Sequence, residues 1–226
     1  AATERGGIEY LPTYYSYKLA VGPELAGKLD INATIRENLR VAAAILGMDI
    51  SELTCVVLNR DRHREIIDEI RKVGARIKLI SDGDIAAAIA TALPGSDVNI
   101  YIGVGGSPEA LLAAAALKSL GGEIQIKLWP MDENERLRIA EKGYDVERVY
   151  KTDDLIKSDN VIFAATGVTD GDMLSGVRFV KNTAITESIV MRSKTRTIRR
   201  IIAQHNMSFK TIPLKSAGEI RYQNGL

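Results

Sequence analysis

The residues best suited to chemistry lie in the glycine-rich segment 103–109, which follows an apolar run and precedes the alanine-rich stretch 110–120. This order predicts a strand, a loop and a helix, with Ser107 at the N-cap and Pro108 at the first helical position. The free backbone N–H groups of the first helical turn, together with the helix dipole, favour an anion. A carboxylate at Glu109 therefore either faces a cation or interacts with the dipole alone.

The glycine pattern fits neither of the common nucleotide-binding loops. The dinucleotide fingerprint needs a third glycine where this chain has Pro108, and a P-loop needs Lys followed by Ser or Thr, which this segment lacks. Gly106 still lets a ligand approach the backbone closely. A tight turn between a strand and a helix could use the same glycines, so the cluster alone leaves both a binding site and a plain turn open.

Two basic residues follow the apolar run 54–58, because Arg60 and Arg62 flank Asp61, with His63 next. Two guanidinium groups after a strand can hold a phosphate bidentately. The alternative is a solvated helix start in which Asp61 pairs with an arginine.

A short acidic loop, Asp82-Gly83-Asp84, follows the next predicted strand, 76–80. Its carboxylates could bind a metal, accept hydrogen bonds from sugar hydroxyls or cap the following helix. Asp84 is suited to the N-cap, so Asp82 is the better functional candidate, while Gly83 permits a positive φ.

A fourth loop, 166–172, offers hydroxyls, carboxylates and glycines without a defined purpose. His63 and His205 have no partners at metal-ligand spacing, which argues against zinc. Any metal would be a hard, oxygen-bound cation such as Mg²⁺ or Mn²⁺.

Strand–loop–helix units recur along the chain and predict an α/β fold, a layered, mainly parallel sheet with helices on both faces. Loops at the C-terminal ends of parallel strands meet at one edge, so we expect all four loops there. Beyond Val177 the pattern becomes strand-like and basic, and from Asn206 it shows little periodicity. The expected helices cover 32–46 (capped by Asn32), 64–73, 85–92, 110–120 and 133–142, and the expected strands 54–58, 76–80, 98–103, 123–128 and 161–165.

The composition is that of an ordinary soluble protein, with 226 residues, 46% of them apolar, and a net charge of +1. Near-neutral charge argues against a general nucleic-acid partner. The single cysteine, Cys55, lies in an apolar run, so no internal disulfide can form, which fits a reducing compartment. Neither a membrane-spanning run nor a signal peptide is visible, and we expect a cytoplasmic protein without a membrane partner.

The loops described above and the segments that flank them, taken in chain order, resemble the C-terminal two-thirds of class II fructose-1,6-bisphosphatases, including the dual fructose/sedoheptulose enzymes. The resemblance implies a metal-dependent phosphatase with the layered α/β fold of the lithium-sensitive sugar phosphatases. It also implies hydrolysis of fructose 1,6-bisphosphate with Mn²⁺ or Mg²⁺, in gluconeogenesis or carbon fixation, by a homo-oligomer (dimer or tetramer). The matching stretches, between about residues 11 and 205, are YKLAVGPE, VVLNRDRH, ARIKLISDGDIAAAI, GVGGSPEALLAAAALKSLGG, DNVIFAATGVTDGDML and TESIVMRSKTRTIRRI.

By matching position, the resemblance implies one metal ligand, Glu109. The chain departs from the family at Asp61, where proline is usual, at Asn59, where aspartate is usual, and at Ala110, where glycine is common. The implied substrate contacts are Tyr15, Arg60, Asp61, Arg62, Asp82, Gly83, Asp84 and Gly106.

The resemblance also implies a domain plan. Residues 1–30 would be a lead-in segment continuing from an N-terminal part, 31–205 the sugar-phosphate-binding α/β domain, and 206–226 a C-terminal tail. The other metal-binding carboxylates and the groups that activate the attacking water would lie in that N-terminal part, so this chain alone would lack the full catalytic set. The alternative is a non-catalytic sugar-phosphate-binding or regulatory module of the same fold.

Overall fold

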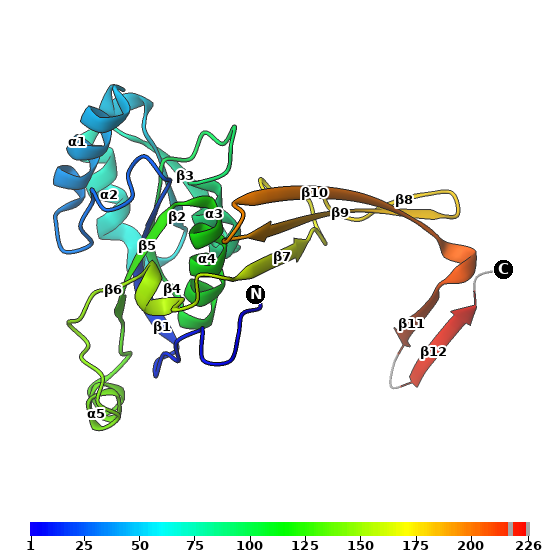
Figure 1. The fold of residues 1–226 in the computed structure, drawn as a ribbon. Coiled ribbons are helices and arrows are strands. Elements are labelled where there is room, and N and C mark those ends of the chain that lie inside the picture. Colours follow the sequence, from blue (N-terminus) through cyan, green and yellow to red (C-terminus); the bar gives the residue numbers. More distant parts are fainter. Residues whose placement is uncertain (217–218, 225–226) are drawn as a thin grey trace. The chain divides into compact units, whose positions relative to one another are not determined.

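The computed structural model describes residues 1–216 and 219–224. Two compact units make up the chain. The first contains Ala1–Phe163 and Met191–Thr197, and the second contains Ala164–Val190 and the residues from Ile198 onward (Figure 1). The expected domain boundaries near residues 30 and 205 stay a prediction.

The first unit is built on a six-stranded sheet in the order β3-β2-β4-β1-β5-β6. Strand β2 pairs in parallel with both β3 and β4, whereas β1 is antiparallel to β4 and β5. Four strands, β2 to β5, therefore run in one direction, which confirms the expected α/β class. The strands are β1 (Tyr15–Val21), β2 (Thr54–Leu58), β3 (Arg76–Ile80), β4 (Ile100–Gly106), β5 (Glu123–Leu128) and β6 (Tyr150–Lys151).

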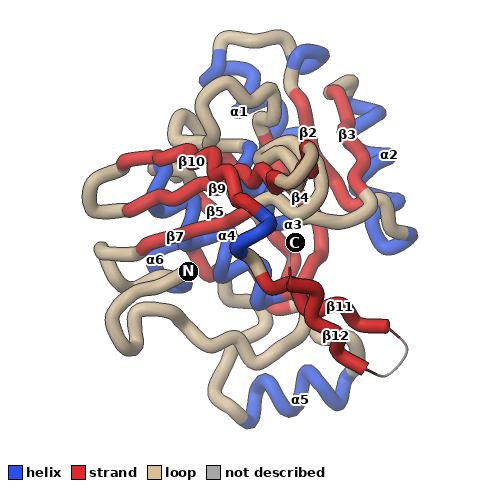
Figure 2. The backbone as a smooth tube through the Cα atoms, turned by 90° about the vertical axis from the view of Figure 1, so that its right-hand side faces the viewer, coloured by secondary structure: helices blue, strands red, loops and turns tan. Residues whose placement is uncertain are grey.

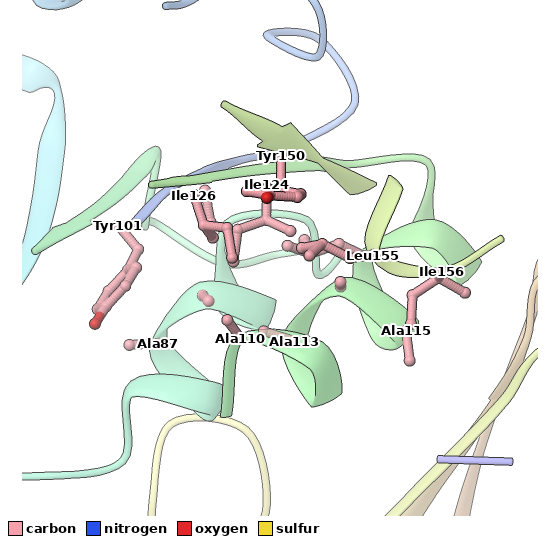
Figure 3. Packing of buried hydrophobic residues seen from close by; sticks show 14 of the residues in the cluster. Ala87, Tyr101, Ala110, Ala113, Ala115, Ile124, Ile126, Tyr150, Leu155 and Ile156 are labelled. Atoms are coloured by element: carbon pink, nitrogen blue, oxygen red, sulfur yellow. The ribbon is translucent and has the colours of Figure 1, made fainter. Parts of the chain in front are cut away.

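Helices cover both faces of this sheet, as expected. Helices α1 (Ile35–Leu46) and α2 (Arg64–Val73) bury their apolar side chains with one face. Helices α3 (Asp84–Ala90) and α4 (Ser107–Leu120) pack on the other. Figure 3 shows this second layer, with alanines of α3 and α4 packed against Tyr101, Ile124 and Ile126 of the sheet. The short alanine side chains bring the start of each helix close to the strand ends. The remaining helices are α5 (Glu133–Glu141) and α6 (Thr152–Leu155).

Three helix starts differ from the prediction by one to three residues. Helix α1 is capped by Thr34 rather than Asn32, since the Thr34 hydroxyl accepts from the Glu37 N–H at 3.2 Å. Gly83 and Gly106 occupy the N-cap positions of α3 and α4. Asp84 and Ser107 are therefore the first helical residues, and the N-cap roles predicted for them are wrong.

The second unit contains most of a separate sheet, in the order β10-β9-β7 with β8 paired to β9. Its strands, red in Figure 2, are β7 (Ile162–Thr166), β8 (Arg178–Val180), β9 (Thr183–Arg192) and β10 (Thr197–Asn206). Strand β7 thus does not extend the six-stranded sheet, so the prediction that it and loop 166–172 belong to the same parallel sheet as β2, β3 and β4 is wrong. After Asn206, where little regularity was expected, β11 (Thr211–Ser216) and β12 (Glu219–Asn224) form a hairpin.

Within the described part of the chain, no helix has both the length and the apolar character needed to cross a lipid bilayer.

Candidate functional site

Three of the predicted loops meet at the C-terminal ends of the neighbouring strands β3, β2 and β4. The Arg60 guanidinium donates a hydrogen bond to the Ser81 carbonyl, with 2.6 Å between Nη2 and the oxygen. Arg62 donates from Nε and Nη2 to the Val104 carbonyl, at 3.2 and 2.9 Å. The arginines that follow β2 therefore tie this loop to Ser81 after β3 and to Val104 in β4, which confirms that the three predicted segments share one edge. The predicted glycine loop 103–109 is itself the end of β4, up to Gly106, and the first turn of α4.

The sheet is open at this edge because β2 and β4 separate there. Their paired residues are Cys55 with Ile100 and Val56 with Tyr101, both well before the C-terminal ends of the two strands. Beyond these pairs the ring of His63 bridges the gap. Its Nδ1 lies 2.7 Å from the Leu58 carbonyl oxygen, and its Nε2 accepts from the Val104 N–H at 2.8 Å.

These partners assign a neutral imidazole with its proton on Nδ1, since a carbonyl can only accept and an N–H can only donate. Burial lowers the pKa of His63, and the nearby charges of Arg62 and Arg60 act in the same direction, while the hydrogen bonds to Leu58 and Val104 oppose them. His63 is fully buried. It holds the strand ends apart and is a structural part of the site.

A buried ion pair lies next to the glycine loop. The Lys18 Nζ on β1 is 2.7 Å from Asp84 Oδ2 at the start of α3, and the two side chains are 2% and 12% exposed. Glycine at position 105 leaves room for this pair, because a Cβ there would overlap Asp84 Oδ2 and lie 3.0 Å from Lys18 Nζ. Lys18 was missed by the sequence analysis, although a lysine directly before the apolar run Leu19–Val21 was an available signal.

The carboxylate of Glu109, in the first turn of α4, folds back against Gly106. A Cβ at position 106 would overlap Glu109 Oε2 and lie 2.7 Å from its Cδ. Glu109 is half-buried and acts electrostatically on Lys18. Burial lowers the pKa of Lys18, whereas the charges of Asp84 and Glu109 oppose that shift. The glycines of the loop thus make room for His63, for the Lys18–Asp84 pair and for Glu109.

The other residues predicted to contact substrate belong to the same loops or to the neighbouring strand β1. Tyr15 is paired in register with Gly106, and the Arg62 guanidinium carbon lies 5.4 Å from the centre of the Tyr15 ring. Asp82 is exposed, and Gly83 has a φ of 80°. Asp61 is fully exposed and lies 3.4 Å from Arg64, a surface pair of little energetic weight.

Three buried hydroxyls in and beside these loops have no hydrogen-bond partner among the described residues. They belong to Ser16, which is paired in register with Gly105, to Ser107 and to Tyr101. Burial raises the pKa of Tyr101, and the charge of Asp84 adds to the shift. Buried polar groups are normally satisfied, so polar atoms without partners mark this region as one arranged for more than packing.

The described residues do not form a complete metal centre. Across residues 1–216 and 219–224, no group of three or more His, Cys, Asp or Glu side chains is placed to hold a metal ion. Glu109 offers one hard oxygen ligand, the type preferred by Mg²⁺ and Mn²⁺.

A large cavity lies away from these loops. It has a volume of about 790 Å³ and is lined by Gly121 and Gly122, at the C-terminal end of α4, among other residues. The three loops lie at the N-terminal end of the same helix. The cavity therefore does not coincide with the three loops. We identify the candidate site from the chemistry of the loop residues and not from the size of a cavity.

Comparisons with known proteins agree on one family. A family model described as bacterial fructose-1,6-bisphosphatase, glpX-encoded, matches residues 1–205. A class 2 fructose-1,6-bisphosphatase of Haemophilus influenzae is 41% identical over 207 residues, which cover 86% of this chain and 62% of that protein. The class 2 fructose-1,6-bisphosphatase 1 of Escherichia coli K12 is 39% identical over 223 residues, 93% of this chain and 66% of its own length.

A third relative, from Synechococcus sp. strain JA-2-3B'a(2-13), carries the name D-fructose 1,6-bisphosphatase class 2/sedoheptulose 1,7-bisphosphatase. It is 39% identical over 218 residues, which cover 91% of this chain and 63% of that protein. The chain thus spans slightly less than two-thirds of the length of these relatives.

Proposed function

This chain belongs to the family of bacterial, glpX-encoded fructose-1,6-bisphosphatases, and we propose that it carries the substrate-binding part of an enzyme that hydrolyses fructose 1,6-bisphosphate to fructose 6-phosphate and phosphate. The observation that supports this most is the meeting of two chemically different loops at one sheet edge. The loop after β2 presents Arg60 and Arg62, and the first turn of α4, which follows β4 directly, presents Glu109.

The two arginines are proposed to bind the phosphate that is not cleaved. Each guanidinium has five N–H donors, and the backbone carbonyls bonded to Arg60 and Arg62 leave several of them free. Arginine binds phosphate through paired, charge-assisted hydrogen bonds. Binding energy from the remote phosphate would fix the position of the reacting one.

The sugar between the two phosphates would lie over the acidic loop. Asp82 and Asp84 are proposed to accept hydrogen bonds from its hydroxyls, with Gly83, Gly106, Tyr15 and Asp61 completing the contacts. Glu109 is proposed as one ligand of a divalent cation, Mn²⁺ or Mg²⁺, whose other ligands would lie outside the described residues. When bound, such a cation would polarise the phosphoryl oxygens and lower the pKa of the attacking water.

We also propose that the enzyme is a cytoplasmic homo-oligomer, a dimer or tetramer, acting in gluconeogenesis or carbon fixation. Its partner would be a sugar bisphosphate rather than a nucleic acid or a membrane. The family assignment supports the substrate class, while the assembly and the location rest on the resemblance alone.

A second candidate is a binding module without catalysis. The supporting observation is that no three His, Cys, Asp or Glu side chains of the described residues are grouped so that they could hold a metal ion. One experiment separates the two candidates, namely phosphate release from fructose 1,6-bisphosphate in Mn²⁺ by the full-length protein that contains this chain. Metal-dependent release supports the phosphatase. Bisphosphate binding by folded protein, without release above background, would support the binding module and overturn the proposal.

A further inference from the structure

We propose that Lys18 is a positioning residue for the sugar-phosphate site, acting through Asp84, whose carboxylate it holds and whose charge it offsets so that an anionic sugar phosphate can approach. The inference rests on the proposed function and adds a residue to it. Its basis is the 2.7 Å contact between Lys18 Nζ and Asp84 Oδ2 beside the glycine loop.

The fold places Lys18 on the face of β1 that points toward α3 and α4. Side chains alternate along a strand, and Ala20, two residues further along, belongs to the core on that face. Lys18 is paired in register with Gly103 of β4 and with Ile126 of β5. Because β1 is a central strand, the lysine is 2% exposed, and its ammonium group reaches the sheet edge only where glycines leave room.

Asp84 is bound through only one of its two oxygens. Oδ2 accepts from Lys18, whereas Oδ1 has no hydrogen-bond partner among the described residues. A carboxylate fixed on one oxygen and free on the other can accept a hydrogen bond from a sugar hydroxyl in a defined direction. Lys18 would thus fix the orientation of Asp84 before substrate arrives.

The charges at this edge favour a buried cation beside Asp84. Asp84, Glu109, Asp82 and Asp61 are four carboxylates around a site proposed to bind two phosphates, each carrying roughly −1.5 to −2 charges near neutral pH. Arg60 and Arg62 provide positive charges at the surface, and Arg64 lies 3.4 Å from Asp61 there. Lys18 provides a positive charge from within the protein, where solvent and salt screen it least.

A purely structural role explains the pair less well. A buried ion pair is often no more stabilising than apolar side chains of the same volume. This one also requires glycine at position 105, which raises the conformational entropy lost on folding. A pair used only for stability would gain nothing from lying beside the substrate loops.

The test compares Lys18→Met, Asp84→Asn and the double variant with wild type in the full-length protein, measuring KM and kcat for fructose 1,6-bisphosphate. We expect K18M to raise KM about tenfold or more, the effect of one charge-assisted contact, with a smaller change in kcat. In the D84N background, adding K18M should change KM by less than about threefold, because Asp84 no longer needs its partner. The matched control is Lys72→Met, which breaks an exposed 2.7 Å pair with Glu69 and should leave KM unchanged.

Two outcomes overturn the inference: folded K18M with a KM within twofold of wild type, or an equal rise in KM in both backgrounds. If K18M alone does not fold, the comparison of D84N with the double variant decides, since a further tenfold rise in KM contradicts action through Asp84. Failure of the proposed function is a separate result, recognised by a wild-type protein that releases no phosphate at all.

Discussion

Replacing His63 with alanine should destabilise the protein, because the ring bridges two strand ends and is the hydrogen-bond acceptor of a buried N–H. The ring bridges the Leu58 carbonyl and the Val104 N–H, at 2.7 and 2.8 Å, in a fully buried position. The Val104 N–H would be left without this partner, at a cost of about 1–3 kcal/mol, and the lost ring adds a cavity. The Leu58 carbonyl keeps a hydrogen bond from the Arg60 N–H at 2.9 Å. We therefore expect His63→Ala to lower the free energy of unfolding by about 3 kcal/mol.

Urea unfolding followed by far-UV circular dichroism at pH 7.5 measures this loss. The control is His205→Ala, since His205 is only half-buried and its ring nitrogen lies 3.0 Å from the Thr186 hydroxyl. The free energy of unfolding of His205→Ala should be about 1 kcal/mol lower than that of wild type. A loss below about 1 kcal/mol for His63→Ala, or equal losses in the two variants, would refute the bridging role.

The same histidine gives wild type a pH dependence with a defined sign. Its pKa in the folded protein lies below the 6.5 that is usual for histidine, so between those two values the unfolded chain binds a proton that the folded chain does not. The His63 contribution should therefore be flat above pH 6.5. Below it, stability should fall by up to about 1.4 kcal/mol per pH unit. This part of the slope, read from urea midpoints between pH 5 and 7.5, should be absent in His63→Ala. An unchanged slope would contradict a neutral, buried ring.

Two further substitutions test the glycine loop. Glu109→Gln should abolish metal-dependent phosphate release while changing the free energy of unfolding by only about 0.3–1 kcal/mol, and near-normal turnover at saturating Mn²⁺ would leave Glu109 as a helix-end residue. Gly105→Ala should cost about 1–3 kcal/mol in urea unfolding, because the new methyl group must displace the Asp84 carboxylate. The control is Gly171→Ala, whose Cβ would lie 4.0 Å from the nearest atom and which should lower the free energy of unfolding by less than about 0.5 kcal/mol. Equal losses in the two variants would mean that the ion pair does not constrain position 105.

The sequence predicted those parts of the fold that depend on local pattern. Strands β2, β3 and β5 match their predicted bounds, and the three loops after β2, β3 and β4 were expected to share an edge. Continuous apolar runs mark strands buried on both faces, and Gly74 and Gly121 end helices in the left-handed conformation that glycine favours.

What the sequence did not predict depends on contacts between distant residues. Strand β1 was not predicted because Ser16 and Lys18 interrupt its apolar pattern. The lysine is buried there with Asp84, 66 residues away in the sequence, as its partner. Strand β7 was assigned to the wrong sheet because the strand that pairs with it, β9, comes later in the chain. The role of His63 as a bridge follows from the separation of β2 and β4, which no local pattern records.

The pair Arg60 and Arg62 tests the central claim, that these loops bind a sugar bisphosphate, most directly. Kinetics of the full-length protein with both arginines replaced by alanine should show a KM for fructose 1,6-bisphosphate raised on the order of a hundredfold or more, because two charge-assisted groups are lost. A monophosphate substrate without the anchored phosphate should be affected far less. Equal losses on both substrates, with folded protein, would mean that the arginines only tie Ser81 and Val104 into the loop framework, and would contradict the account.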